Sequence, residues 1–115
     1  MFQMSAIGPM AGQWNHFRQV KGKGDQSYGV ERFANETIRL FGVLNSRLSN
    51  RTFIVGEELT VADMCFFPWV KLMFGKFGNG NTNLKRWLDM LSDRPAFAKG
   101  MTLGREVLSS NEAKL

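Results

Sequence analysis

Residues 28–49, YGVERFANETIRLFGVLNSRLS, show the clearest pattern of apolar and polar positions in the chain. Apolar residues, interrupted by one threonine, recur three or four positions apart, which is the spacing of one face of an α-helix. On the opposite side, Glu36 is spaced to pair with Arg32 or with Arg39. We therefore predict an amphipathic helix whose apolar stripe faces the core. The predicted stripe consists of Val30, Phe33, Thr37, Leu40, Phe41, Leu44 and Leu48.

Two segments in the second half of the chain repeat this pattern. Residues 83–93 have the same helical spacing of apolar positions. Residues 94–101 begin a new helix with Pro95, which suits a first helical position because the N–H that proline lacks would have no partner there. Each segment is long enough for a short helix with one apolar side.

The remaining segments are less regular. Residues 8–17 can begin a helix at Pro9, although the Gly8–Pro9 pair should break any helix that arrives from Phe2. Residues 51–56 have the composition of a strand, but they are a single short segment with nothing to pair with. The prediction is an all-α fold, an irregular bundle of about four or five helices.

The run ELTVADMCFFPWV (58–70) carries one carboxylate, Asp63, within its apolar part. Thr60 and Asp63 have the spacing of a capping box, in which the two residues satisfy each other's backbone N–H groups at the start of a helix. The sequence shows no clear acid–base partner for Asp63, so a structural role is favoured over acid–base catalysis. The helix that follows has little polar surface on any side, which indicates a central helix surrounded by the others, kinked at Pro68. Cys65 has no basic neighbour to activate it and is predicted to be an inert buried thiol.

Composition and charge narrow the class of protein. A length of 115 residues suits one domain, and a single cysteine excludes an internal disulfide or a cysteine-based metal cluster. The chain has no signal-peptide pattern, and its longest apolar run is far shorter than the roughly 20 residues of a membrane span, so a cytoplasmic protein that does not bind a membrane is expected.

The net charge of +5 is not gathered into a dense basic stripe, and nucleic-acid binding is not expected. His16 is the only histidine, and no metal site is expected.

The capped run LTVADMCFFPWV, followed by NLKRWLDMLSDRPAF, resembles the C-terminal helical domain of cytosolic glutathione transferases. In that family the pattern S/T-x-A-D marks the central helix, and L-x-x-W-x-x-x-x-x-x-R-P closes the domain. The segments FQMSAIGPMAGQWNHF and YGVERFANETIRLFGVLNSRL are similar to the Nu-class enzymes, also described as disulfide-bond oxidoreductases, and to the yeast prion-forming nitrogen regulator. The resemblance covers residues 2–101 and implies a helical domain over residues 1–103, with a weakly helical tail over residues 104–115.

Members of this family carry a thioredoxin-like domain ahead of the helical one, which holds glutathione and the groups that activate its thiol. The 115 residues contain no such segment, and the resemblance implies that they start inside the first helix of the helical domain. We therefore expect a fragment of a longer enzyme or a truncated gene product, with no catalytic residue of its own and inactive by itself. The intact protein is expected to be a homodimer that uses glutathione as co-substrate, without a metal, on a small electrophilic or disulfide substrate.

The resemblance also implies which residues contact ligands. In the segment Y-x-x-E-R-[YF] of Nu-like relatives an arginine contacts glutathione, and Arg32 occupies that place; an ion pair with Glu36 is the alternative. The hydrophobic co-substrate pocket of the family is lined partly by the first helix of this domain, and core packing is the alternative for the residues concerned. These candidates are Met10, Gln13, Trp14 and Phe17.

Two functions from different classes remain open at this point. One is the helical domain of a glutathione transferase or glutathione-dependent disulfide reductase. The other is a non-enzymatic protein-interaction module of the same fold, as in translation elongation factor or tRNA-synthetase assemblies. A thioredoxin-like segment upstream of Met1 would favour the enzyme, and a true start at Met1 would favour a repurposed domain. The isolated chain is expected to associate, because a shortened first helix leaves an apolar face exposed.

Overall fold

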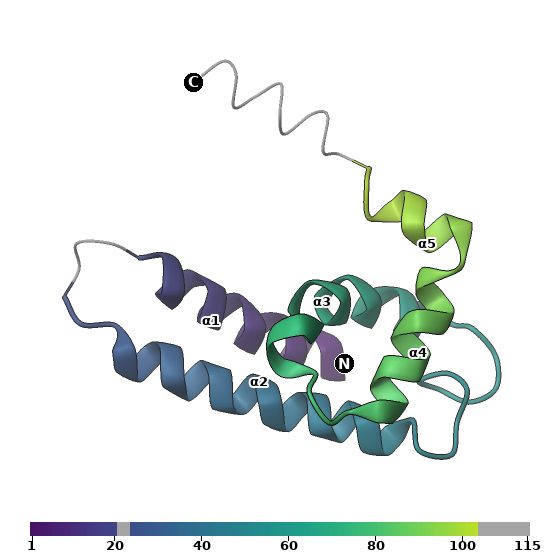
Figure 1. The fold of residues 1–115 in the computed structure, drawn as a ribbon, viewed down its shortest axis with the longest axis horizontal. Helices are drawn as coiled ribbons and strands as arrows, with labels where there is room; N and C mark the ends of the chain where they lie inside the picture. The colour runs from purple at the N-terminus through teal and green to yellow at the C-terminus, as the bar shows by residue number, and fades with distance from the viewer. Residues whose placement is uncertain (21–23, 104–115) are drawn as a thin grey trace.

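The structure is a computed structural model that describes residues 1–20 and 24–103 (Figure 1). A short π-helix leads into five α-helices, and the described residues form no strand, so the predicted all-α fold is confirmed. No helix within these ranges combines the length and the apolar character needed to cross a membrane. The predicted tail, residues 104–115, lies outside the described residues. The elements are η1 (Gln3–Ile7), α1 (Gly8–Gln19), α2 (Ser27–Arg47), α3 (Val61–Phe77), α4 (Thr82–Ser92) and α5 (Pro95–Gly100).

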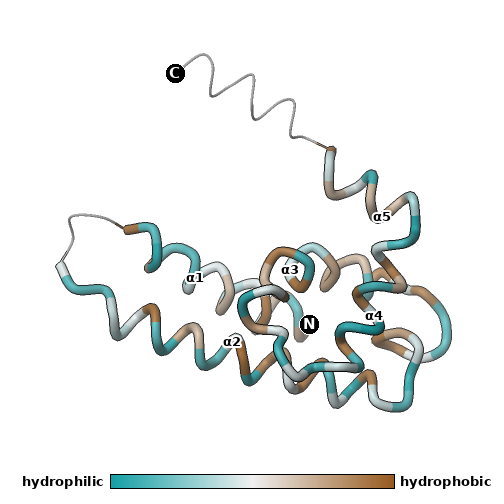
Figure 2. Tube along the Cα trace, in the orientation of Figure 1, coloured by the Kyte–Doolittle hydropathy of each residue, from teal (hydrophilic) through white to brown (hydrophobic). Residues whose placement is uncertain are grey.

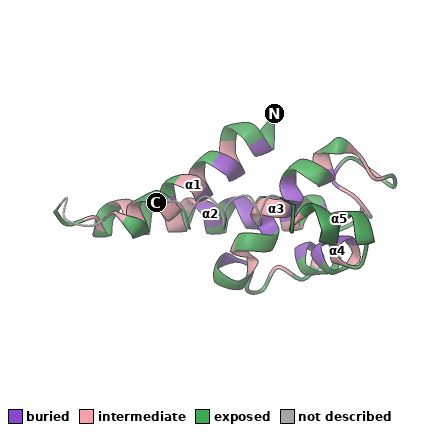
Figure 3. Cartoon of the chain, turned by 90° about the horizontal axis from the view of Figure 1, so that it is seen from above, coloured by how far each residue is buried: buried purple, intermediate pink, exposed green. Residues whose placement is uncertain are grey.

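The helices form an extended hairpin and a cluster at one end of it (Figure 1). Helices α1 and α2 run antiparallel, α3 and α4 pack at the C-terminal half of α2, and α5 follows α4. Apolar positions gather where α2, α3 and α4 face one another (Figure 2). Buried residues lie on the same inward sides of the helices (Figure 3). The helices predicted over residues 28–49 and 83–93 are present as α2 and α4, and Pro95 is the first residue of α5.

The apolar stripe predicted for α2 supplies much of the core. Its C-terminal part is buried, and Val30 and Phe33 are half-buried against the same cluster. Thr37 is also buried, and its hydroxyl donates to the Phe33 carbonyl over 2.7 Å, so the polar atom keeps a partner. The fully or nearly fully buried members of the stripe are Thr37, Leu40, Phe41, Leu44 and Leu48.

The chain stays helical through Gly8–Pro9, where the sequence led us to expect a break. Gly8 has helical angles, with φ −58° and ψ −55°, and η1 continues directly into α1. The Gly8 N–H bonds to the Gln3 carbonyl five residues back, and this wider π-turn accommodates a proline that would crowd a regular α-helical turn. A Cβ on Gly8 would lie 2.9 Å from Gln3 Nε2, so a larger residue here would require the end of the Gln3 side chain to move.

Asp63 is fully buried at the start of α3, and its carboxylate is the centre of a hydrogen-bond network. The predicted capping box is present: the Thr60 N–H donates to Oδ2 over 3.0 Å, and the Thr60 hydroxyl accepts from the first turn. Oδ1 accepts from the Ile54 N–H over 3.0 Å and from Trp87 Nε1 over 2.8 Å. One side chain therefore ties the start of α3 to the preceding loop and to α4, which the spacing of the capping box alone does not indicate.

Helix α3 is covered on one side only, so the prediction that other helices surround it is wrong. Its inward side, with Phe66, Phe67 and Val70, is buried in the core. On the outward side Val61, Met64 and Leu72 are 71%, 53% and 66% exposed. Cys65 is also exposed, contrary to the prediction of a buried thiol. The apolar composition indicated that all sides of the helix would be buried, but the other described helices pack against only one side.

Helices α2 and α4 cap each other. The side-chain carbonyl of Asn45 in α2 accepts from the backbone N–H groups of Asn83 and Leu84, over 2.9 and 3.1 Å, at the start of α4. The residue before α4 makes no side-chain cap of its own. In return, the Arg86 guanidinium donates to the Leu48 carbonyl at the end of α2 over 2.9 Å. Both helix ends thus have their free backbone groups satisfied by a neighbouring helix.

We predict that Asp63→Ala lowers the free energy of unfolding by about 3–5 kcal/mol. The change leaves the N–H groups of Ile54, Thr60 and Trp87 without an acceptor, and each unmatched buried donor costs about 1–3 kcal/mol. Urea unfolding followed by circular dichroism measures the effect. Asp89→Ala, which removes an exposed ion pair on α4, is the control and should cost less than about 1 kcal/mol. Coinciding urea midpoints for the parent and Asp63→Ala would contradict the structural role.

For Asn45→Ala we predict a loss of about 1–2 kcal/mol, the usual cost of removing a helix cap. Asn35→Ala provides the matched control, because Asn35 is an exposed asparagine on the same helix. That control should change the free energy of unfolding by less than about 0.5 kcal/mol, as is usual for a surface substitution. Thermal or urea unfolding of both variants makes the comparison, and equal effects would show that Asn45 does not stabilise α4.

Candidate functional site

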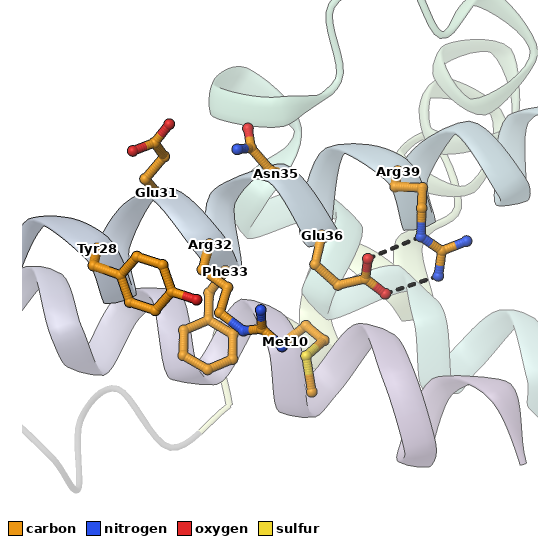
Figure 4. Close-up of a pocket in the computed structure, with 8 residues that line it drawn as sticks. All are labelled: Met10, Tyr28, Glu31, Arg32, Phe33, Asn35, Glu36 and Arg39. Carbon is orange, nitrogen blue, oxygen red and sulfur yellow. Dashed lines mark hydrogen bonds and ion pairs between the residues drawn. The ribbon is translucent and has the colours of Figure 1, made fainter.

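An open pocket with a volume of about 870 Å³ lies along the junction of α1 and α2 (Figure 4). Met10 of α1 forms part of its lining, and α2 supplies the other residues. The polar face of α2 therefore forms most of this site, opposite the stripe that the same helix buries in the core. The lining residues are Met10, Tyr28, Glu31, Arg32, Phe33, Asn35, Glu36 and Arg39.

The Arg32 guanidinium is available to a ligand in this pocket. Arg39 takes the neighbouring carboxylate: its Nε and Nη2 lie 2.8 and 2.7 Å from the two oxygens of Glu36. The hydrogen bond from Arg39 is the main cause that lowers the pKa of Glu36 below its usual value, and the charge of Arg32 adds a smaller effect. In the part of the chain that the structure describes, no hydrogen bond or ion pair holds Arg32. The alternative role considered for Arg32, an ion pair with Glu36, is therefore not formed.

Arg32 lies against apolar side chains. Figure 4 shows its guanidinium beside Met10 and Phe33, with the Tyr28 ring on the same side of α2, whereas Glu31 rises from the other side. A guanidinium in such surroundings suits a planar anion such as a carboxylate, to which it can donate two parallel hydrogen bonds. The lining contains no serine, threonine, cysteine or histidine, so the arrangement favours binding over nucleophilic catalysis. Across residues 1–20 and 24–103, no group of three or more His, Cys, Asp or Glu side chains gathers as a metal site would require.

Helix α1 places its four predicted co-substrate residues in different surroundings. Met10 is half-buried and shares the pocket with Arg32. Trp14 is 6% exposed and belongs to the core, edge-on to a phenylalanine of α3 at 4.9 Å. Phe17 stacks on a phenylalanine of α2, with the ring centres 5.4 Å apart, and Gln13 is exposed. The structure thus brings one of the four, Met10, to Arg32, and contact of any of them with a co-substrate stays a prediction.

Tyr28, Glu31 and Asn35 line the same pocket, and the sequence reading did not assign them to a site. Their spacing was a usable signal, because positions 28, 31, 32 and 35 are neighbours on one face of a helix. In the sequence pattern this face is simply the polar side of the helix, opposite the apolar stripe. Asp63, in contrast, is fully buried and lines neither this pocket nor the smaller groove beside α5.

Residues 21–95 match the family described as "Glutathione S-transferase, C-terminal domain". This match takes in more than half of the chain, and the observed all-helical fold is that of the domain. The chain belongs to this family.

Three individual proteins show which members of the family this chain resembles. The chain is 31% identical over 106 residues to the disulfide-bond oxidoreductase YfcG of Escherichia coli, a match that takes in 87% of this chain and 47% of YfcG. A crystal structure of a glutathione transferase from Burkholderia graminis, with two glutathione molecules per subunit, is 35% identical, with a TM-score of 0.78 over 91% of this chain and 47% of that one. The nitrogen regulation fragment of the yeast prion protein Ure2p is 30% identical, with a TM-score of 0.75 over 87% of this chain and 49% of that one. The resemblance to disulfide-bond oxidoreductases and to the yeast regulator is thus confirmed, and the chain spans about half the length of these relatives.

Proposed function

We propose that this chain is the helical, co-substrate-side domain of a glutathione-dependent transferase or disulfide reductase, and that Arg32 binds a carboxylate of glutathione. The observation that carries the proposal is the unpaired guanidinium in an open pocket, since its neighbour Glu36 is already held by Arg39. Relatives whose solved structures contain glutathione support the choice of ligand. Glutathione is an acidic tripeptide, so its free carboxylates suit such a guanidinium.

The reaction we propose is attack of a glutathione thiolate on a small electrophile or on a mixed disulfide. The residues around Arg32 position the peptide and its co-substrate, and the apolar side chains of Met10 and Phe33 suit an adaptable apolar wall. Activation of the thiol falls to the thioredoxin-like domain that the family carries. We further propose that the working protein is a homodimer, as the family resemblance implies, and that it is cytoplasmic, in keeping with the single cysteine of the chain.

Arg32→Ala is predicted to weaken glutathione binding about 10- to 100-fold. Hydrogen bonds to a charged group contribute about 1.5–3 kcal/mol, and about 1.4 kcal/mol corresponds to a tenfold change in affinity. The measurement is titration calorimetry with glutathione, on this chain linked behind the part of YfcG that lies outside the matched region. Arg32→Lys keeps the charge but loses the two-pronged geometry, so its affinity should lie between those of the parent and of Arg32→Ala.

Arg94→Ala is the matched control, because Arg94 is exposed just before α5 and lies outside the pocket lining. Its affinity for glutathione should equal that of the parent. Arg32→Ala with the affinity of Arg94→Ala would remove Arg32 from the binding site. Circular dichroism of each variant separates a lost contact from a lost fold.

A further inference from the structure

Two charged side chains of the pocket between α1 and α2 have no partner among the described residues. The lining contains four charged residues, and two of them, Glu36 and Arg39, are bonded to each other over 2.7 and 2.8 Å. Across residues 1–20 and 24–103, no hydrogen bond or ion pair holds Glu31, just as none holds Arg32. The pocket therefore offers a ligand one negative charge and one positive charge.

Glu31 and Arg32 lie on two sides of the same helix face. They are consecutive residues of α2, so their side chains leave the helix about 100° apart. At 3.6 residues per turn, the positions of Tyr28 and Asn35 fall between them, and all four residues line the pocket. Figure 4 shows the Glu31 carboxylate on the opposite side of α2 from the Arg32 guanidinium. A ligand that lies across Tyr28 and Asn35 therefore has a carboxylate on one side and a guanidinium on the other.

The free carboxylate of Glu31 affects which ligands the pocket accepts. Glu31 and Arg32 are both exposed, so both charges face a ligand in the pocket. A ligand that carries only carboxylates is attracted by Arg32 and repelled by Glu31. A ligand that also carries an ammonium group turns this repulsion into an attraction, because an ammonium donates up to three hydrogen bonds and a carboxylate accepts them. The pair thus selects for a ligand with both charges.

Glutathione has both kinds of charge, since it carries two carboxylates and one ammonium group, the latter on its γ-glutamyl residue. We propose that Glu31 binds this ammonium group and makes the pocket selective for peptides with a free α-amino group. The inference rests on the proposed role of this pocket in glutathione binding, in which Arg32 holds a carboxylate of the same peptide. Glu36, the other carboxylate of the lining, is less suited to this task because both its oxygens are bonded to Arg39.

N-acetylglutathione tests the role of Glu31, because it keeps both carboxylates and lacks the ammonium group. Titration calorimetry compares its affinity with that of glutathione, on the YfcG fusion used for Arg32 and on the Glu31→Gln variant of that fusion. The parent should bind glutathione about 3- to 5-fold more tightly than the acetylated peptide, which is near the upper end for an exposed ion pair. This preference should be largely lost in Glu31→Gln. Any effect of the bulk of the acetyl group is common to both proteins and cancels from the comparison.

Glu58→Gln is the matched control, because Glu58 is exposed and lies outside the pocket lining. It should keep the preference of the parent. Arg32→Ala should weaken the binding of both peptides alike, since both carry the carboxylates. The ratio of two affinities measured on one variant does not depend on the folded fraction of that variant, so it reports the contact with the ammonium group and not the fold.

The role of Glu31 and the role of Arg32 can fail separately. Equal affinities of the parent for both peptides, or an unchanged preference in Glu31→Gln, would overturn the inference about Glu31, and weaker binding by Arg32→Ala would still support the proposed function. Loss of the preference in Glu31→Gln together with unchanged affinities in Arg32→Ala would support Glu31 and remove Arg32 from the site. A parent that binds neither peptide would overturn both.

Discussion

A buried carboxylate with no cationic partner among the described residues holds the cluster of helices together. Asp63 is compensated by hydrogen-bond donors, namely the N–H groups of Ile54, Thr60 and Trp87 and the Thr60 hydroxyl, and by the positive end of the α3 dipole. Because these donors come from a loop and two helices, satisfying the charge fixes all three relative to one another. The mutual capping of α2 and α4 then extends this order to the C-terminal end of α2.

Helix α2 connects this framework to the candidate site. One face buries the stripe that includes Leu40, Phe41 and Leu44, and the other presents Arg32 to the pocket. A rigid helix is a good platform for a binding residue, since packing on one side limits the movement of the other. The Glu36–Arg39 ion pair leaves the charge of Arg32 available to a ligand, because the Glu36 carboxylate that could otherwise pair with Arg32 is bonded to Arg39. The pocket is open on its outer side, and its lining has no serine, threonine, cysteine or histidine, so it suits binding better than nucleophilic catalysis.

Helix α3 shows that the burial of side chains is harder to predict from the sequence than the helices themselves. An apolar residue indicates that a side chain is to be covered, but not which part of the protein covers it. For Phe66 and Phe67 the cover is the core of this domain. For Met64, Cys65 and Leu72 no described element supplies it, so the prediction of a central helix with a buried thiol failed on that side while it held on the other.

The sequence by itself determined the helices, their approximate bounds, the apolar stripe of α2 and the capping box at Thr60 and Asp63. These features depend on residues within one or two helical turns, where spacing and capping preferences act directly. The sequence also identified the family, through motifs that span most of the chain. The tertiary structure decided the partners of Asp63 across the loop and α4, and the cap that Asn45 provides for α4. It also decided that the helix continues through Gly8–Pro9 and that Glu36 pairs with Arg39, which leaves Arg32 without an ion pair. Each of these features depends on which groups lie next to each other after folding. Where a group has two possible partners at similar spacing in the sequence, as Glu36 has, the packed helices decide which one lies within hydrogen-bond distance.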